Sequence, residues 1–166
     1  MMPKQPHIQV IKSQRKLYVF DGPALIKSYS CITGSNIGDK QIEGDRKTPE
    51  GCFQIVFKNP HSKFHLSLGL DYPNKEDADR GLEQGLLSAD IYNQLIHDLQ
   101  HSDMADEQVQ NRVWKTPLGG EIFIHGCAEG RTGTAGCVAL TNPDMTELYA
   151  LCPVGTSVEI MAGTGH

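Results

Sequence analysis

The stretch IFIHGCAEGRTGTAGCVALTN, residues 122–142, places an apolar run ending in His125 opposite Cys137 across a glycine-rich loop. A thiolate attacks carbonyl carbons far better than a thiol does, and a free cysteine with a pKa of about 8.5 is only slightly ionised at neutral pH. If the loop folds back, His125 can take the proton of Cys137. Gly126 and Gly136 stand beside these residues and allow positive φ and close approach of a substrate. The stretch therefore predicts a thiol nucleophile, Cys137, with His125 as its general base.

The backbone amides around Gly136 and Cys137 are candidates for stabilising a developing oxyanion. Plainer interpretations stay open. Free cysteines are usually buried and inert, and a histidine that ends an apolar strand is often a core residue. Cys127 alternates with His125 and could form a metal or redox pair with Cys137, but His-x-Cys followed by a single cysteine lacks the paired ligands of a structural zinc site. We expect no metal here.

The bulk composition narrows the classes of function. The chain has 166 residues, a formal net charge of −5 and a pI near 5.7, which disfavours nucleic acid as a partner. Five cysteines at irregular spacings exclude a complete disulfide framework. No run approaches the ~20 apolar residues of a membrane span. The first twenty residues contain no apolar signal segment, so we expect either a cytoplasmic protein or a mature form without its leader.

The pattern along the chain predicts a mainly β, α+β fold in one domain, residues 1–166. In FHLSLGLDY, residues 64–72, apolar side chains alternate with polar or small ones, which is typical of a half-buried strand. Helical spacing begins after Ser88, and Pro143 suits the first turn of a short helix after Cys137. We expect a helical insertion at about 76–116. The predicted strands cover residues 7–11, 16–20, 24–33, 52–57, 64–72, 121–126, 136–140 and 155–161, and the predicted helices cover residues 88–101, 102–114 and 141–151.

Two motifs in order carry a family resemblance. His125-Gly126 is followed by Thr134-Ala135-Gly136-Cys137, and GDRKTPEG lies upstream at residues 44–51. These resemble the His-Gly, Ser/Thr-x-Gly-Cys and Gly-Asp-x-x-Thr-Pro-x-Gly signatures of the L,D-transpeptidase catalytic-domain family, the YkuD type. The match extends from about Ile8 to Ile160, and the run after the cysteine is similar to the YafK-like branch.

The resemblance implies a fold, a substrate and a chemistry. The fold would be a β-sandwich-like mixed sheet with the site at one edge. The substrate would be the stem peptide of peptidoglycan, in a role in cell wall biogenesis and cell shape. Cys137 would attack the carbonyl of the third stem residue, a diamino acid, and form a thioester acyl-enzyme. His125 would act as base and later as acid, with its other ring nitrogen held by a backbone carbonyl near Gly126. No cofactor is expected.

The same resemblance leaves the biological outcome open. An amine acceptor gives transpeptidation, whereas water gives L,D-hydrolysis that releases stem residues or a peptidoglycan-linked lipoprotein. A non-catalytic peptidoglycan-binding module and a cytosolic thiol protein are two further classes that the residues permit. Because peptidoglycan lies outside the inner membrane, the resemblance implies a periplasmic or cell-envelope location.

This chain departs from the family pattern after the nucleophile. The family commonly has an arginine two places after the cysteine, where this chain has Ala139. We expect Arg131 to supply the missing cation, and we expect Thr134 and Tyr72 to contribute to substrate binding. For Asp45 and Arg46 we favour a structural turn over substrate contact.

Overall fold

The computed structural model describes residues 2–163, which form one mixed eight-stranded sheet and four α-helices. The strand order is β3-β2-β1-β8-β4-β5-β6-β7. The strands are β1 (Pro6–Ile11), β2 (Lys16–Asp21), β3 (Ala24–Ser30), β4 (Gly51–Ser62), β5 (His65–Leu70), β6 (Phe123–His125), β7 (Val138–Ala139) and β8 (Ser157–Met161). The helices are α1 (Lys75–Glu83), α2 (Ala89–His101), α3 (Glu107–Trp114) and α4 (Asn142–Leu151).

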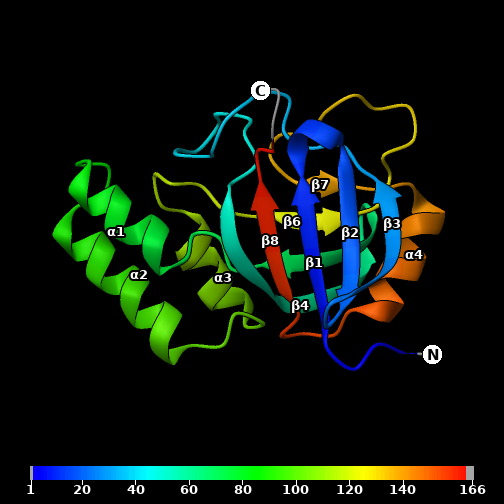
Figure 1. Ribbon diagram of the computed structural model, residues 1–166. Helices are drawn as coiled ribbons and strands as arrows, with labels where there is room; N and C mark the ends of the chain where they lie inside the picture. Colours follow the sequence, from blue (N-terminus) through cyan, green and yellow to red (C-terminus); the bar gives the residue numbers. More distant parts are fainter. Residues whose placement is uncertain (1, 164–166) are drawn as a thin grey trace.

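The sheet curls into two layers because β4 belongs to both. Residues 51–54 of β4 pair with β8, and residues 55–62 pair with β5, both antiparallel. Figure 1 shows β1, β2, β3 and β8 in front of β5, β6 and β7. The side chains between the layers form the main core, in which Ile8, Leu68 and Ile124 are almost completely buried. This confirms the predicted β-sandwich-like mixed sheet.

The three N-terminal strands form where the sequence predicts them. Strands β1, β2 and β3 pair in antiparallel order, and β8 joins β1 in parallel. Alternation of apolar and polar residues explains the pairing, because Ile8 and Val10 of β1 and Leu17 and Val19 of β2 turn to the core.

The strand predicted at residues 64–72 forms as β5, but the prediction that it is half-buried is wrong. Within β5, Ser67 and Gly69 are buried along with Leu68 and Leu70. A Cβ at Gly69 would overlap the Phe57 ring, so the absence of a side chain lets that ring cover the strand. The face that looks polar in sequence is therefore covered as well.

The helical insertion lies between β5 and β6, to the left of the sheet in Figure 1. Ser88 caps α2, and its side chain accepts a hydrogen bond from the Ile91 N–H. Helix α1 is missing from the predicted helices, although Asn74 and Asp77 form a capping box at its start. The insertion has its own apolar cluster, which includes Leu95, Val113 and Leu118.

Helix α4 follows β7, with Thr141 as its N-cap and Pro143 in its first turn. Its buried side chains, Met145 and Leu148, join the main core. In residues 2–163, no helix combines the length and apolar character needed to span a membrane.

Candidate active site

Strands β6 and β7 bring the two predicted catalytic residues to one face of the sheet. The strands are parallel neighbours, with Ile124 opposite Val138, and both of these side chains are buried. Since side chains alternate along a strand, His125 and Cys137, one position to either side, lie on the opposite face. The Phe123 N–H lies 3.4 Å from Cys137 Sγ, in agreement with this register.

His125 is oriented by its own loop. Its Nδ1 lies 2.6 Å from the Gly126 carbonyl oxygen. A carbonyl can only accept, so Nδ1 carries a proton and Nε2 has the free lone pair of the neutral ring. The ring also stacks on Phe64, with 4.3 Å between ring centroids. This geometry agrees with the predicted role of Gly126 as the orienting group.

Burial lowers the pKa of His125, and the nearby Arg131 cation lowers it further, while the hydrogen bond to Gly126 opposes both effects. A lowered pKa keeps the imidazole neutral at neutral pH, which is the form that a general base requires.

Cys137 rests as a thiol. Its Sγ donates to the Glu121 carbonyl oxygen at 3.3 Å and accepts from the Phe123 N–H. Burial raises the pKa of Cys137 to about 11, and the Glu121 carboxylate adds to that increase, whereas the Phe123 N–H opposes it. Within residues 2–163, neither hydrogen bond of the thiol is to His125. The structure therefore contains an uncharged Cys137 thiol and a neutral His125 ring whose Nε2 lone pair is free.

A cavity of about 310 Å³ opens beside the thiol. Three segments line it: residues 40–46 of the upstream loop, residues 120–122 before β6, and residues 135–137. The charged residues that line it are Lys40, Glu43, Arg46 and Glu121. The backbone of Glu121 has φ of +57°, which a non-glycine residue rarely adopts. The sequence contains no local signal for Glu121, because only this backbone conformation presents its carbonyl to Cys137.

The turn before Cys137 is fixed by hydroxyl groups. Thr134 Oγ1 donates to the Cys137 carbonyl oxygen at 2.6 Å and accepts from the Gly136 N–H at 3.0 Å. Thr48 Oγ1 donates to the Gly136 carbonyl oxygen at 2.7 Å. Gly136 has φ of +147°, and a Cβ there would lie 3.0 Å from the Lys47 carbonyl oxygen, so a side chain is excluded.

These contacts correct three predictions. Thr134 is buried and its hydroxyl is occupied, so it positions the nucleophile turn instead of binding substrate. The Gly136 N–H already donates to Thr134 and is not free for an oxyanion. Tyr72 is fully buried and donates to the Leu118 carbonyl oxygen at 2.8 Å, so it cannot line a substrate cleft.

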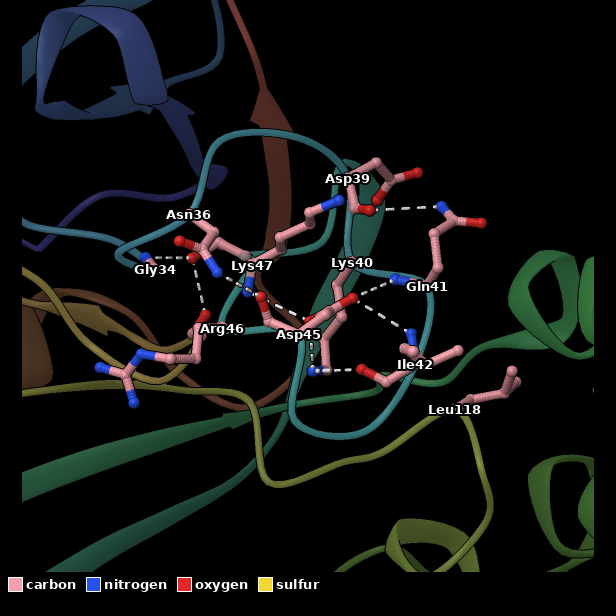
Figure 2. Close-up of polar contacts among 12 residues, drawn as sticks. Gly34, Asn36, Asp39, Lys40, Gln41, Ile42, Asp45, Arg46, Lys47 and Leu118 are labelled. Atoms are coloured by element: carbon pink, nitrogen blue, oxygen red, sulfur yellow. Dashed lines mark hydrogen bonds and ion pairs between the residues drawn. The ribbon is translucent and has the colours of Figure 1, made fainter.

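The GDRKTPEG loop is organised by Asp45, as Figure 2 shows. The Asp45 carboxylate accepts hydrogen bonds from the Gln41, Ile42 and Lys47 N–H groups at 2.8, 3.1 and 3.1 Å and pairs with Lys40 Nζ at 3.0 Å. Burial alone would raise the pKa of Asp45, but these hydrogen bonds outweigh it and lower the pKa. The predicted structural turn at Asp45 is therefore confirmed.

Arg131 lies apart from the cavity. It is exposed, and its guanidinium carbon is 6.0 Å from the centroid of the Phe64 ring. It is not among the residues that line the cavity. Cys127 is a free cysteine whose N–H donates to Asn142 Oδ1, and all five cysteines are free thiols. In the described part of the chain, no three His, Cys, Asp or Glu side chains are arranged to hold a metal ion.

The curled mixed sheet, in which His125 ends β6 and Cys137 directly precedes β7, is the fold of solved L,D-transpeptidases. The family model for the L,D-transpeptidase catalytic domain, YkuD, matches residues 5–160. The chain belongs to this family.

Relatives and solved structures agree with this membership. YafK of Escherichia coli (strain K12) is 32% identical over 90 residues, which cover 50% of this chain and 37% of YafK. Bd1075 of Bdellovibrio bacteriovorus has a similar structure, with a TM-score of 0.62 and 23% identity over 96% of this chain and 48% of that chain. The helical cell shape determining protein Pgp2 of Campylobacter jejuni gives a TM-score of 0.59 and 21% identity over 98% of this chain and 50% of its own. The chain thus spans about half the length of these structures and less of YafK.

Proposed function

We propose that this domain is a cysteine-dependent peptidoglycan L,D-transpeptidase that acts on stem peptides through a thioester acyl-enzyme. The observation that carries the proposal is the hydrogen bond from His125 Nδ1 to the Gly126 carbonyl oxygen, 2.6 Å long, which leaves Nε2 as a base on the face of the sheet that Cys137 occupies. Family membership supports the reaction class, and the cavity beside the thiol supports a substrate site.

Acylation begins when the thiol leaves the Glu121 carbonyl and turns to His125. Nε2 takes the thiol proton, and Sγ forms a bond to the carbonyl carbon of the third stem residue, a diamino acid. The carbon–nitrogen bond to the terminal D-residue then breaks, and Nε2 returns the proton to the departing amine. Because burial raises the pKa of Cys137 to about 11, this transfer to His125 is needed at neutral pH.

The oxyanion that forms during attack requires an N–H donor. We assign the Cys137 N–H to this role in place of the Gly136 N–H. Among residues 2–163, no side chain or loop carbonyl accepts a hydrogen bond from the Cys137 N–H, whereas the Gly136 N–H is engaged by Thr134.

The acceptor determines the product. An amine of a second stem peptide gives a new cross-link, whereas water gives hydrolysis that trims a stem or releases an attached lipoprotein. In either case Nε2 takes a proton from the attacking group and the thiolate leaves. Action on peptidoglycan implies a periplasmic or cell-envelope location for the protein.

The test is acylation by a carbapenem followed by digestion of purified sacculi. We expect one adduct by mass spectrometry, on Cys137, which is retained in Cys127→Ala and absent in Cys137→Ala. New cross-links between third residues would support transpeptidation, and shortened stems would support hydrolysis. An adduct on Cys127 would overturn the assignment of the nucleophile. Binding of sacculi without any turnover would favour the non-catalytic module.

A further inference from the structure

Arg46 lines the cavity beside Cys137 and has no acidic partner among residues 2–163. It lines the cavity together with Lys40. The Lys40 ammonium is occupied, since it pairs with Asp45 at 3.0 Å and donates to the Ile42 carbonyl oxygen at 3.1 Å. None of the ion pairs formed within residues 2–163 involves Arg46. An anionic ligand in this cavity would therefore meet one uncommitted cation.

The guanidinium of Arg46 is held in place while most of its donors stay free. Nε donates to Ser35 Oγ at 2.7 Å, and Nη2 donates to the Thr134 carbonyl oxygen at 3.3 Å. A guanidinium has five N–H donors, so three remain, including both on Nη1. These form the planar fork that binds a carboxylate, and its orientation is already fixed before any ligand arrives.

The backbone explains how this side chain reaches the cavity. Arg46 has φ of +58°, and its carbonyl oxygen accepts the Asn36 N–H at 3.0 Å. The hydrogen bonds of Asp45 to the neighbouring amides stabilise this turn (Figure 2). A strained non-glycine conformation maintained beside a candidate nucleophile is typical of a functional position.

The residue that holds the Arg46 guanidinium, Thr134, also contacts Cys137. Thr134 accepts from the guanidinium through its carbonyl and donates to the Cys137 carbonyl through its hydroxyl. The guanidinium is thus connected to the nucleophile turn through a single residue.

We propose that Arg46 binds the terminal carboxylate of the departing D-residue and so selects donors that end one residue after the scissile bond. This inference rests on the proposed function. In such a donor only the amide nitrogen and one Cα separate the scissile carbonyl carbon from the carboxylate, so the anion must lie close to Cys137. Glu43 and Glu121 line the same cavity and repel an anion, which leaves the Arg46 side as its place.

Arg131 provides a matched control. It is also an exposed arginine close to the site, but it lies over Phe64 and outside the cavity. Its charge acts on His125 and Cys137 over a distance, because it lowers the pKa of both groups. Removing it changes proton affinity, whereas removing Arg46 changes recognition of one substrate group.

The experiment uses two synthetic tetrapeptide stems that differ only in a C-terminal carboxylate or carboxamide. We measure kcat/KM for release of the terminal residue by the wild-type protein, Arg46→Gln and Arg131→Gln. The wild type is expected to prefer the carboxylate roughly tenfold to a hundredfold, the usual range for a hydrogen-bonded charge pair. Arg46→Gln should bring the ratio of kcat/KM for the carboxylate donor to kcat/KM for the carboxamide donor down to about one, while Arg131→Gln should keep the wild-type ratio.

The carboxamide donor reports on folding, because a misfolded Arg46→Gln protein would lose both donors equally. Equal loss, or a preference that survives in Arg46→Gln, overturns the role of Arg46. Binding of both peptides to the Cys137→Ala protein, measured by calorimetry, makes the same comparison without turnover. Failure of the wild type to cleave either donor counts against the proposed function, whereas equal binding of the two peptides counts against Arg46.

Discussion

The two glycine-rich loops that meet at the cavity, residues 31–50 and residues 126–137, are stabilised in different ways. The first is held by buried charges: Lys40 pairs with Asp45, and Lys12 Nζ bonds to the Gly38 and Thr48 carbonyl oxygens, each at 2.8 Å. The second has no buried ion pair within the part of the chain that the structure describes. It is held by hydrogen bonds to its surroundings, such as the one from Thr48 to Gly136.

The difference indicates that the two loops have different roles. The loop at 31–50 is a scaffold whose buried Lys40 and Asp45 side chains pair with each other, and it supplies the surface against which the turn before Cys137 packs. The loop at 126–137 carries the candidate nucleophile, Cys137, and is held by contacts with other segments. Substitutions at the buried charges of the first loop should therefore change stability, and substitution of Cys137 in the second should change activity.

The largest expected effect belongs to the nucleophile. Cys137→Ala should lower turnover by on the order of 10³-fold or more, because no thioester can form, while the melting temperature stays close to that of the wild type. Activity on stem peptides and thermal unfolding of the same preparations check this. Cys127→Ala, in the same loop, should keep activity, and loss of activity in both variants would contradict the assignment.

The next effect tests the scaffold. Asp45→Asn should lower the free energy of unfolding by about 2–3 kcal/mol, because three backbone N–H groups and the buried Lys40 lose a charged acceptor. Glu129→Gln is the matched control in the other loop, where an exposed carboxylate accepts one N–H, from Asn142, and we expect no measurable change. Urea titrations of both variants compare the two loops directly.

The pH dependence of the Asp45 contribution has a definite sign. Since the folded-state pKa of Asp45 is lowered, its stabilisation is fully present above the unfolded pKa near 4 and is lost as the pH falls through the folded value. The difference in unfolding free energy between the wild type and Asp45→Asn should thus shrink on acidification. A difference that grows as the pH falls would contradict the assignment.

A smaller effect should come from the contact between the loops. Thr48 Oγ1 donates to the Gly136 carbonyl oxygen and accepts from the Gly34 N–H at 2.8 Å, so Thr48→Val leaves two buried groups without partners. We expect a loss of about 1–3 kcal/mol in unfolding free energy and slower acylation by a carbapenem. Thr132→Val, at an exposed position of the second loop, should change neither. If the Thr48→Val protein were less stable but were acylated at the wild-type rate, the contact from Thr48 would not help to position Cys137.

The smallest effect concerns the proton affinity of His125. The Arg131 cation lowers the pKa of His125, so Arg131→Gln should raise it and move the acidic limb of the kcat/KM profile to higher pH. The change in rate should stay under about tenfold at any pH, since burial remains the main cause of the lowered pKa. A limb that moves to lower pH in Arg131→Gln would contradict this account.

Much of the fold and the central pair were accessible from sequence. Runs rich in β-branched and aromatic residues predicted the strands that form β1, β2 and β3, and the glycine-flanked His125 and Cys137 predicted a candidate catalytic pair. The orientation of His125 by Gly126 followed from the family resemblance, and the structure agrees with it.

Two errors at the site share one cause. Tyr72 and Thr134 looked available for substrate because both are polar, yet the fold buries them and engages their hydroxyl groups with backbone carbonyls. Polarity in sequence does not reveal whether a hydrogen-bonding group faces solvent or another segment.

The sequence by itself determined which residues can do the chemistry and which stretches form strands, because reactivity belongs to the side chain and strand formation depends on the local pattern of residues. The tertiary structure alone decided what surrounds the thiol. Lys40, Glu43, Arg46 and Glu121 reach one cavity from segments up to 81 residues apart, and two of them do so through positive φ angles. Charge and accessibility at the site depend on contacts across these long separations, and no local pattern records them.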